Sequence, residues 1–259
     1  MQIGGRDFTG CVWYVPFSAL AKTLMREAVE SAVAFPIFSL DDSATAAFTG
    51  AQAGNGYQVQ GDSGFYTNPD SAMYLRSNKV MTFDNSQDLT IEVWYLTGPS
   101  VAAVDVFAGA LDNSILNWGV YATGSKPALL FKNGAGITRY AQTNDAMVAN
   151  TLYCFHFVKT RNLSLKIFQN GENPSSYLNQ DTGDIGSYTM TQTDGVGGSG
   201  GNTCPDRVLA VGRFDKAFTR TEARLAARMG PDFGMKAIPD STGANIRFNP
   251  KRRTNMFSI

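Results

Sequence analysis

The chain has 259 residues, and its 22 Lys and Arg balance its 22 Asp and Glu, so the formal net charge is zero. Proteins that bind nucleic acid carry a basic surplus that neutralises phosphates, and we therefore expect no nucleic-acid partner. Three cysteines are too few for a disulfide scaffold. No stretch of the sequence approaches the ~18 apolar residues of a membrane-spanning helix, so we expect no membrane partner either.

Residues 1–34 are predicted to form an arm that precedes the main domain. Cys11–Phe17 is a short apolar segment within it. Over Ser18–Ala34 apolar residues recur at helical spacing, which predicts a helix that Pro36 ends. The first ten residues lack a basic segment followed by an apolar run, so we expect no secretory signal.

Residues 35–229 show the pattern of one large β-domain. Leu89–Leu96 alternates with the period of two that is typical of a strand. Regular short strands favour a β-sandwich. Those predicted around Leu89–Leu96 are each bounded by turn-forming residues: Ala72–Leu75, Lys79–Phe83, Val104–Leu111, Trp118–Thr123 and Ala128–Lys132.

The segment Leu152–Gly171 predicts two strands folded back on each other. Residues 153–158 alternate as a strand with one buried face, and residues 163–168 alternate again after a polar turn. Asn170-Gly171 then turns the chain. The single histidine, His156, lies on the first of these strands, where we expect it to be satisfied inside the sandwich.

The remaining segments follow in order. Thr182–Pro205 is glycine-rich and predicts a long flexible loop. Val208–Gly212 predicts a strand, and Thr219–Met229 predicts a helix with a T-x-x-E capping box at its start and Gly230 as its stop. Residues 230–259 show little periodicity and are predicted to form an extended tail.

Three segments resemble the concanavalin A-like (laminin-G-like) jelly rolls. The hairpin is similar to that family's W-x-H-V-A-x-T-x-D-G-x-x-x-x-Y-x-N-G pattern. The strand at 89–96 is similar to its T-I-E-x-W segment, and residues 211–227 are similar to its closing strand and helix. The resemblance implies an all-β fold, a jelly-roll sandwich of two antiparallel sheets, here with an N-terminal helical arm and a C-terminal extension. The residues that carry it are His156, Thr160, Asn162, Phe168, Asn170 and Gly171; Thr90, Ile91, Glu92 and Trp94; and Arg213, Ala217, Phe218, Thr219 and Glu222.

Glycoside hydrolysis is the enzymatic activity that this resemblance suggests, and it needs two carboxylates ~5–9.5 Å apart. None of the five glutamates lies two residues from an aspartate on a predicted strand. Glu92 stands alone on its strand, and Glu172 lies in a turn. We therefore expect no enzymatic activity and assign no catalytic residue, and a glycan-cleaving enzyme is the third hypothesis.

No cofactor is expected, and no metal ligands are assigned. One histidine without nearby cysteines or acids in ligand spacing cannot make a zinc site. Calcium stays open, because Asp181, Asp184 and Asp194 carry carboxylate oxygens, although their spacing matches no EF-hand.

Carbohydrate binding is the second hypothesis, in the form of a lectin or a host-recognition module with surface glycans as partners. Aromatic rings cover sugar faces and amides bond sugar hydroxyls. The candidates are aromatic or amide residues expected near loops: Tyr57, Tyr66, Trp118, Asn144, Tyr177 and Tyr188.

The first hypothesis is a non-enzymatic structural protein of a virion, from a tailed bacteriophage. It would be a capsid decoration or cement protein, or a tail or fibre component, made in the host cytoplasm and located in the virion. Its partners would be other virion proteins and copies of itself, because the terminal segments fall outside the jelly-roll pattern. The residues expected to serve assembly are Trp13, Phe17, Lys251, Arg252 and Arg253.

Overall fold

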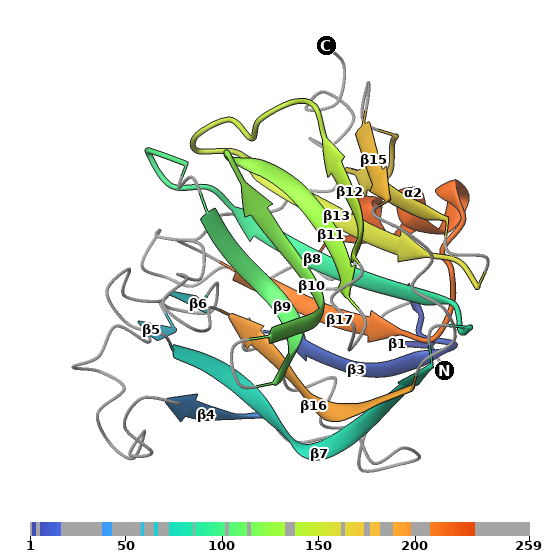
Figure 1. Cartoon of the computed structure of the whole chain (residues 1–259). Helices are drawn as coiled ribbons and strands as arrows, with labels where there is room; N and C mark the ends of the chain where they lie inside the picture. Colours follow the sequence, from blue (N-terminus) through green and yellow to red (C-terminus); the bar gives the residue numbers. More distant parts are fainter. Residues whose placement is uncertain are drawn as a thin grey trace.

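The fold is that of a two-layered antiparallel β-sandwich, seen in a computed structural model (Figure 1). The structure describes residues 2–3, 6–16, 38–42, 58–59, 65–66, 73–84, 86–101, 104–112, 115–132, 138–161, 164–173, 177–181, 189–197 and 208–230. This confirms the predicted all-β sandwich. In the described part of the chain, no helix is both long and apolar enough to cross a membrane.

The larger sheet has eight strands, and the smaller has seven. The larger runs in the order β15 (Tyr177–Asp181), β12 (Thr138–Thr143), β11 (Lys126–Lys132), β10 (Ile115–Thr123), β9 (Val104–Asp112), β16 (Thr189–Gly197), β7 (Met73–Asp84) and β4 (Phe38–Asp42). The smaller runs in the order β14 (Leu165–Gln169), β13 (Leu152–Lys159), β8 (Leu89–Leu96), β17 (Val208–Phe214), β6 (Phe65–Tyr66) and β5 (Gln58–Val59), with β3 (Cys11–Pro16) also paired to β17. A separate short hairpin joins β1 (Gln2–Ile3) to β2 (Arg6–Asp7).

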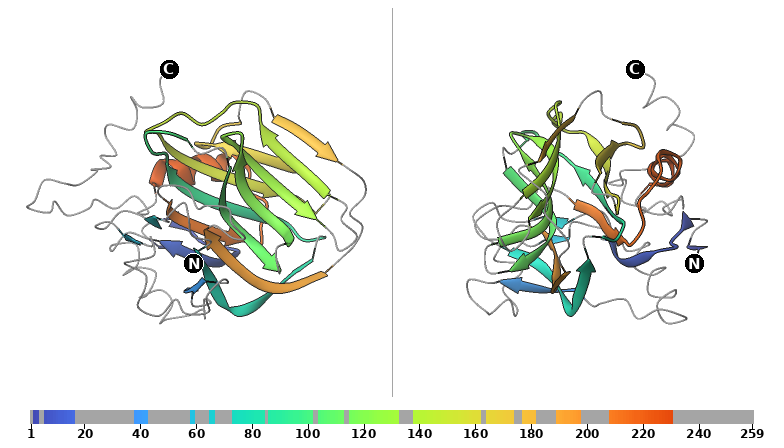
Figure 2. Two further views of the ribbon diagram at one scale, coloured as in Figure 1. Left: turned by 60° about the vertical axis from the view of Figure 1, so that its left-hand side comes forward. Right: turned by 45° about the vertical axis from the view of Figure 1, so that its right-hand side comes forward.

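The helix α2 (Arg220–Met229) lies on the outer face of the seven-stranded sheet, opposite the eight-stranded one (Figure 2). The Thr219 hydroxyl accepts from the backbone N–H of Glu222, and the Glu222 carboxylate accepts from that of Thr219. This capping box, and Gly230 after the last turn, confirm the predicted bounds. The helix buries Ala223, Ala226 and Ala227 against the sheet.

Strand β8 is buried on both faces, which differs from the single buried face that alternation usually indicates. Ile91 and Val93 belong to the core between the sheets. Trp94 and, on the neighbouring strand, Cys154 belong to a second core beneath α2. Because a helix covers the outer face, the middle strands of the seven-stranded sheet are enclosed from both sides.

Two expected strand patterns need correction. Of the expected strands Ala72–Leu75 and Lys79–Phe83, residues 73–75 and 79–83 are parts of the single long strand β7, because β16 and β4 pair with it across the expected turn; Ala72 lies outside the described residues. The glycine-rich segment Thr182–Pro205, predicted as a loop, contains β16, which pairs with β7 and β9. Its Asp194 and Gly195 are buried, so glycine here permits a central strand with a bulge rather than a loop.

The N-terminal segment is corrected as well. Residues 11–16 form β3, which pairs with β17 as part of the seven-stranded sheet rather than as part of a separate arm. Trp13 is fully buried in the core between the sheets, so its side chain cannot make the assembly contact expected of it. The predicted helix Ser18–Ala34, Phe17, and the tail with its basic run lie outside the described residues.

A buried polar bridge joins the two sheets. Asp194 on β16 accepts from the Nη1 group of Arg213 on β17 at 2.8 Å and from the indole Nε1 of Trp13 on β3 at 2.7 Å. Arg213 is 1 % exposed and also contacts Asp215 at 3.3 Å. Asp194, one of the three aspartates that left calcium open, pairs with an arginine inside the sandwich.

Candidate functional site

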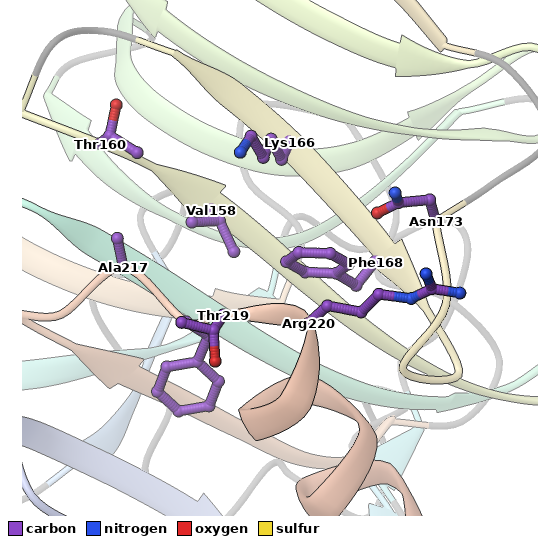
Figure 3. Close-up of a pocket in the computed structure, with 9 residues that line it drawn as sticks. Val158, Thr160, Lys166, Phe168, Asn173, Ala217, Thr219 and Arg220 are labelled. Atoms are coloured by element: carbon purple, nitrogen blue, oxygen red, sulfur yellow. The ribbon is translucent and has the colours of Figure 1, made fainter.

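A pocket of about 450 Å³ lies at one end of the seven-stranded sheet, where α2 begins (Figure 3). The strands β13 and β14 form one wall, and the connection from β17 to α2 forms the other. Nine of the described residues line it: Val158, Thr160, Lys166, Phe168, Asn173, Ala217, Phe218, Thr219 and Arg220.

The hairpin β13–β14 supplies the first wall through its register. Val158 pairs with Lys166, and His156 pairs with Phe168, so these side chains point to one face of the sheet. Val158 and Phe168 belong to the core beneath α2, whereas Lys166 is exposed. The wall is therefore apolar at its base and charged at its rim.

The second wall is held to the sheet by one threonine. The Thr90 hydroxyl on β8 donates to the carbonyl oxygen of Lys216 at 2.6 Å and accepts from the backbone N–H of Phe218 at 2.9 Å. The Phe218 ring packs against two other rings. Its centroid lies 5.5 Å from that of His156 and 4.8 Å from that of Phe214. This fixes the chain at the point where it enters the pocket.

An acidic side chain ties α2 to the turn after β14. Glu172 accepts from Arg220 and from Arg224, one turn further along the helix. Hydrogen bonds from Arg224 and then Arg220 hold the pKa of Glu172 below its ordinary value. Gly171 makes this approach possible, since a Cβ there would lie 2.5 Å from the Cα of Arg224. These contacts fix the position of Arg220 at the pocket rim.

Beneath Phe218 lies a fully buried polar network centred on Glu92. Its Oε1 accepts from Trp94 Nε1 at 2.8 Å and from the Tyr14 hydroxyl at 3.1 Å, and its Oε2 lies 3.0 Å from His156 Nε2. The expectation of a satisfied strand histidine is thus confirmed. Glu92 is completely enclosed, so it cannot reach a glycosidic bond.

The thiol of Cys154 adjoins this network without the geometry of a nucleophile. Its Sγ lies 3.9 Å from both ring nitrogens of His156, so it sits beside the ring rather than along one nitrogen's hydrogen-bond direction. Cys154 is 1 % exposed, as expected for a buried thiol. The cluster of Cys154, His156 and Glu92 is therefore a structural element of the second core.

None of the sequence-predicted sugar-binding residues that the structure describes lines the pocket. Tyr66 lies on β6 of the seven-stranded sheet, while Trp118 on β10 and Tyr177 on β15 belong to the eight-stranded one. Register aligns Tyr177 with Thr143, next to the exposed Asn144. Tyr57 and Tyr188 lie outside the described residues.

Trp118 lies far along the sheet from that edge. It pairs with Phe131, which pairs with Arg139, four residues before Thr143 on β12. At ~3.4 Å per residue this is a separation of roughly 13 Å along the strand. The eight-stranded sheet thus brings Asn144 and Tyr177 together and keeps Trp118 apart.

A pair of tyrosines, Tyr121 and Tyr140, lies on the outer face of the eight-stranded sheet. Tyr121 alternates with the core residues Val120 and Ala122, and Tyr140 alternates with the core residue Ala141, so both tyrosines face away from the core. Their ring centroids are 6.2 Å apart. Burial against neighbouring strands raises the pKa of each hydroxyl above its ordinary value.

Sequence reasoning missed the pocket residues as a functional set. In the sequence, Phe168, Ala217, Phe218 and Thr219 indicate only the resemblance to the jelly-roll fold. The available signal was the exposed Lys166 between the buried Leu165 and Ile167, which places a cation on the face that the helix caps. The meeting of that face with α2 is a tertiary contact that no local pattern records.

The described residues contain no cluster of three or more His, Cys, Asp or Glu side chains suited to a metal ion. Of the three aspartates considered for calcium, Asp194 is engaged by Arg213 and Trp13. Asp181 is on β15, and Asp184 is outside the described residues.

No family model matches the sequence, and no curated protein matches it. Solved structures do resemble the fold. The receptor-binding domain of the botulinum neurotoxin C/D mosaic serotype matches with a TM-score of 0.57 at 8 % identity, over 85 % of this chain and 51 % of that one. The serotype D ligand-binding domain, in complex with N-acetylneuraminic acid, matches with a TM-score of 0.54 at 8 % identity, over the same shares.

The receptor-binding domain of botulinum neurotoxin type G gives a TM-score of 0.51 at 9 % identity, over 83 % of this chain and 50 % of that one. The chain spans about half the length of the solved structures it resembles. At these identities the likeness establishes a shared sheet-rich sandwich architecture.

Proposed function

We propose that this chain is a non-enzymatic carbohydrate-binding domain and that the pocket beside α2 is its binding site. The observation that carries this proposal is the composition of the pocket wall. Aromatic and aliphatic side chains form its base, and hydroxyl and amide groups stand at its rim (Figure 3). A sugar needs both, because its ring face is apolar and its edge carries hydroxyls.

The dimensions of the pocket support a saccharide ligand. Its volume of about 450 Å³ falls in the ~300–1,000 Å³ range of small-molecule sites. Thr160 and Asn173 supply a hydroxyl and an amide around the base formed by Val158 and Phe168, and the Thr219 hydroxyl, which donates to Glu222 in the capping box, offers an acceptor oxygen. This arrangement lets polar groups fix a ring's orientation while apolar contact supplies affinity.

The structural neighbours support the same class of function. One of them was crystallised in complex with N-acetylneuraminic acid, and others are receptor-binding domains. This chain shares its architecture with about half of each of those recognition domains, and we extend recognition of glycans to it.

A binding role without catalysis fits the state of the two glutamates that a hydrolase would need. Glu92 is enclosed and accepts from Tyr14 and Trp94. Glu172 is bound by Arg220 and Arg224, which hold its pKa low and keep it ionised, so it is a poor general acid.

A glycan array probed with the whole chain tests this proposal. Asn173→Ala removes the amide at the pocket rim without breaking a described hydrogen bond, and we expect it to weaken the strongest array signals several-fold. Asn144→Ala is the matched control, because Asn144 is also exposed but lies by the edge of the eight-stranded sheet. Loss of signal with Asn144→Ala and not with Asn173→Ala would move the site to that edge.

A structural role in a bacteriophage virion is the second candidate. In its favour, the sequence continues for 29 residues after Gly230 and carries the basic run Lys251-Arg252-Arg253 there. Such a segment is suited to docking on an acidic neighbouring subunit. Deleting residues 231–259 should then abolish incorporation into particles while thermal unfolding of the sandwich stays unchanged, and normal incorporation would remove this candidate.

A further inference from the structure

The charged residues among the described pocket lining are all positive. Of the nine lining residues that the structure describes, Lys166 and Arg220 are cationic and none is acidic. The two cations stand on opposite walls, Lys166 on β14 and Arg220 at the first position of α2, with the Phe168 ring between them (Figure 3). An occupant of this pocket therefore meets positive charge from two sides.

Both cations keep nitrogen groups that can bind a ligand. Lys166 is exposed and makes no salt bridge with any described residue, so its ammonium group is available to an incoming ligand. Arg220 gives its Nε and Nη2 groups to Glu172, which leaves Nη1 outside that contact. The ion pair with Glu172 also orders the Arg220 side chain, and an ordered guanidinium loses less entropy when it binds an oxyanion.

We infer that the ligand of this pocket is an acidic saccharide, one whose ring carries a carboxylate or a sulfate. This inference rests on the proposed carbohydrate-binding function and names its substrate class. The acidic group lies between Lys166 and Arg220, where charge-assisted hydrogen bonds are stronger than those to neutral hydroxyls. The sugar ring lies over the apolar base, and Thr160, Asn173 and Thr219 contact its hydroxyls.

Isothermal titration calorimetry on the whole chain tests this with saccharides that differ only in the acidic group. Sulfated lactose is compared with lactose, and sialyllactose and tetragalacturonate are each compared with their methyl esters. We expect each acidic member to bind at least tenfold more tightly than its neutral parent, and its affinity to fall as salt screens the cations. The carboxylated and sulfated probes together identify which oxyanion the pocket prefers.

The variant Lys166→Gln should weaken binding of the acidic probes about tenfold and leave the neutral ones unchanged, since one charged hydrogen bond is lost. Lys166→Arg should restore most of the affinity. Lys126→Gln, on the other sheet at the β10–β11 turn, is the matched control and should change nothing.

The outcomes separate this inference from the proposed function. Equal affinity for acidic and neutral probes, insensitive to salt and to Lys166→Gln, would overturn the acidic ligand and leave carbohydrate binding standing. Absence of binding to every saccharide would overturn both. Acidic binding that Lys126→Gln abolishes and Lys166→Gln does not would also overturn the assignment to this pocket.

Discussion

His156 and Glu92 face each other on the neighbouring strands β13 and β8, with Nε2 3.0 Å from Oε2 and both side chains completely buried. They lie on the outer face of the seven-stranded sheet, and Phe218 covers the histidine ring. The pocket base therefore rests on a polar pair enclosed within an apolar layer. A buried pair of this kind is fragile to the removal of one partner.

Replacing Glu92 with Leu should lower the free energy of unfolding by about 3–5 kcal/mol, because the histidine and two further donors lose their acceptor. Glu92→Gln keeps one acceptor oxygen and should cost less. Urea denaturation followed by fluorescence measures both. The double variant Glu92→Leu/His156→Leu should cost less than the sum of the single ones, and strict additivity would show that the pair is not coupled.

The approach of α2 to the β14 turn depends on Gly171. This residue has φ of 79°, and a Cβ would lie 2.5 Å from the Cα of Arg224. Gly171→Ala should therefore destabilise the protein by more than the ~1 kcal/mol that a positive φ alone costs. Gly124→Ala is the control, since its φ is 57° and no atom lies within 4 Å of the added Cβ. Equal thermal shifts for the two variants would contradict the close contact.

The attachment of α2 should depend on pH through Glu172. Its pKa lies below the ordinary value of 4.5 because Arg224 and Arg220 donate to the carboxylate. A carboxyl with a lowered folded-state pKa stabilises the fold above its unfolded pKa, and that contribution is lost as the pH falls through the folded value. We expect α2 amide chemical shifts to titrate below pH 4.5 with contributions from Glu172 and from Glu222, whose pKa also lies below its ordinary value, and the Glu172 contribution to vanish in Glu172→Gln. A Glu172 carboxyl that titrates at its ordinary value would contradict this.

The bridge between the sheets should be sensitive to Asp194. Asp194→Ala leaves the 1 % exposed Arg213 without its closest carboxylate, and we expect a loss of about 3–5 kcal/mol in the free energy of unfolding. Asp215→Asn removes the other carboxylate, whose side chain is 43 % exposed, and should cost less than about 1 kcal/mol. Similar losses for the two variants in urea denaturation would show that burial does not set the strength of this bridge.

Alternation and turn chemistry predicted much of this fold. Strand β8 has the predicted bounds, and α2 begins after the predicted cap residue Thr219. The resemblance to concanavalin A-like jelly rolls predicted two antiparallel sheets, which the structure confirms. Strand alternation and helix capping are local patterns, and the jelly-roll motifs recur within a family. Both kinds of pattern can therefore be recognised in a single sequence.

Other features depend on distant neighbours and escaped local reasoning. Strand β16 lies within a glycine-rich segment that predicts a loop, but it is held between β7 and β9. Trp13 was assigned to an arm because β17, its pairing partner, lies about 200 residues further along the chain. The pocket likewise forms only where the β13–β14 hairpin meets the start of α2.

Mapping of backbone amide chemical shifts during saccharide titration tests the central claim most directly, because it locates the ligand without a mutation. We predict that shifts concentrate at Thr160, Lys166, Asn173 and Thr219 and are larger with sialyllactose or sulfated lactose than with lactose. Shifts confined to the outer face of the eight-stranded sheet, around Tyr121 and Tyr140, or no shifts with any saccharide, would contradict it.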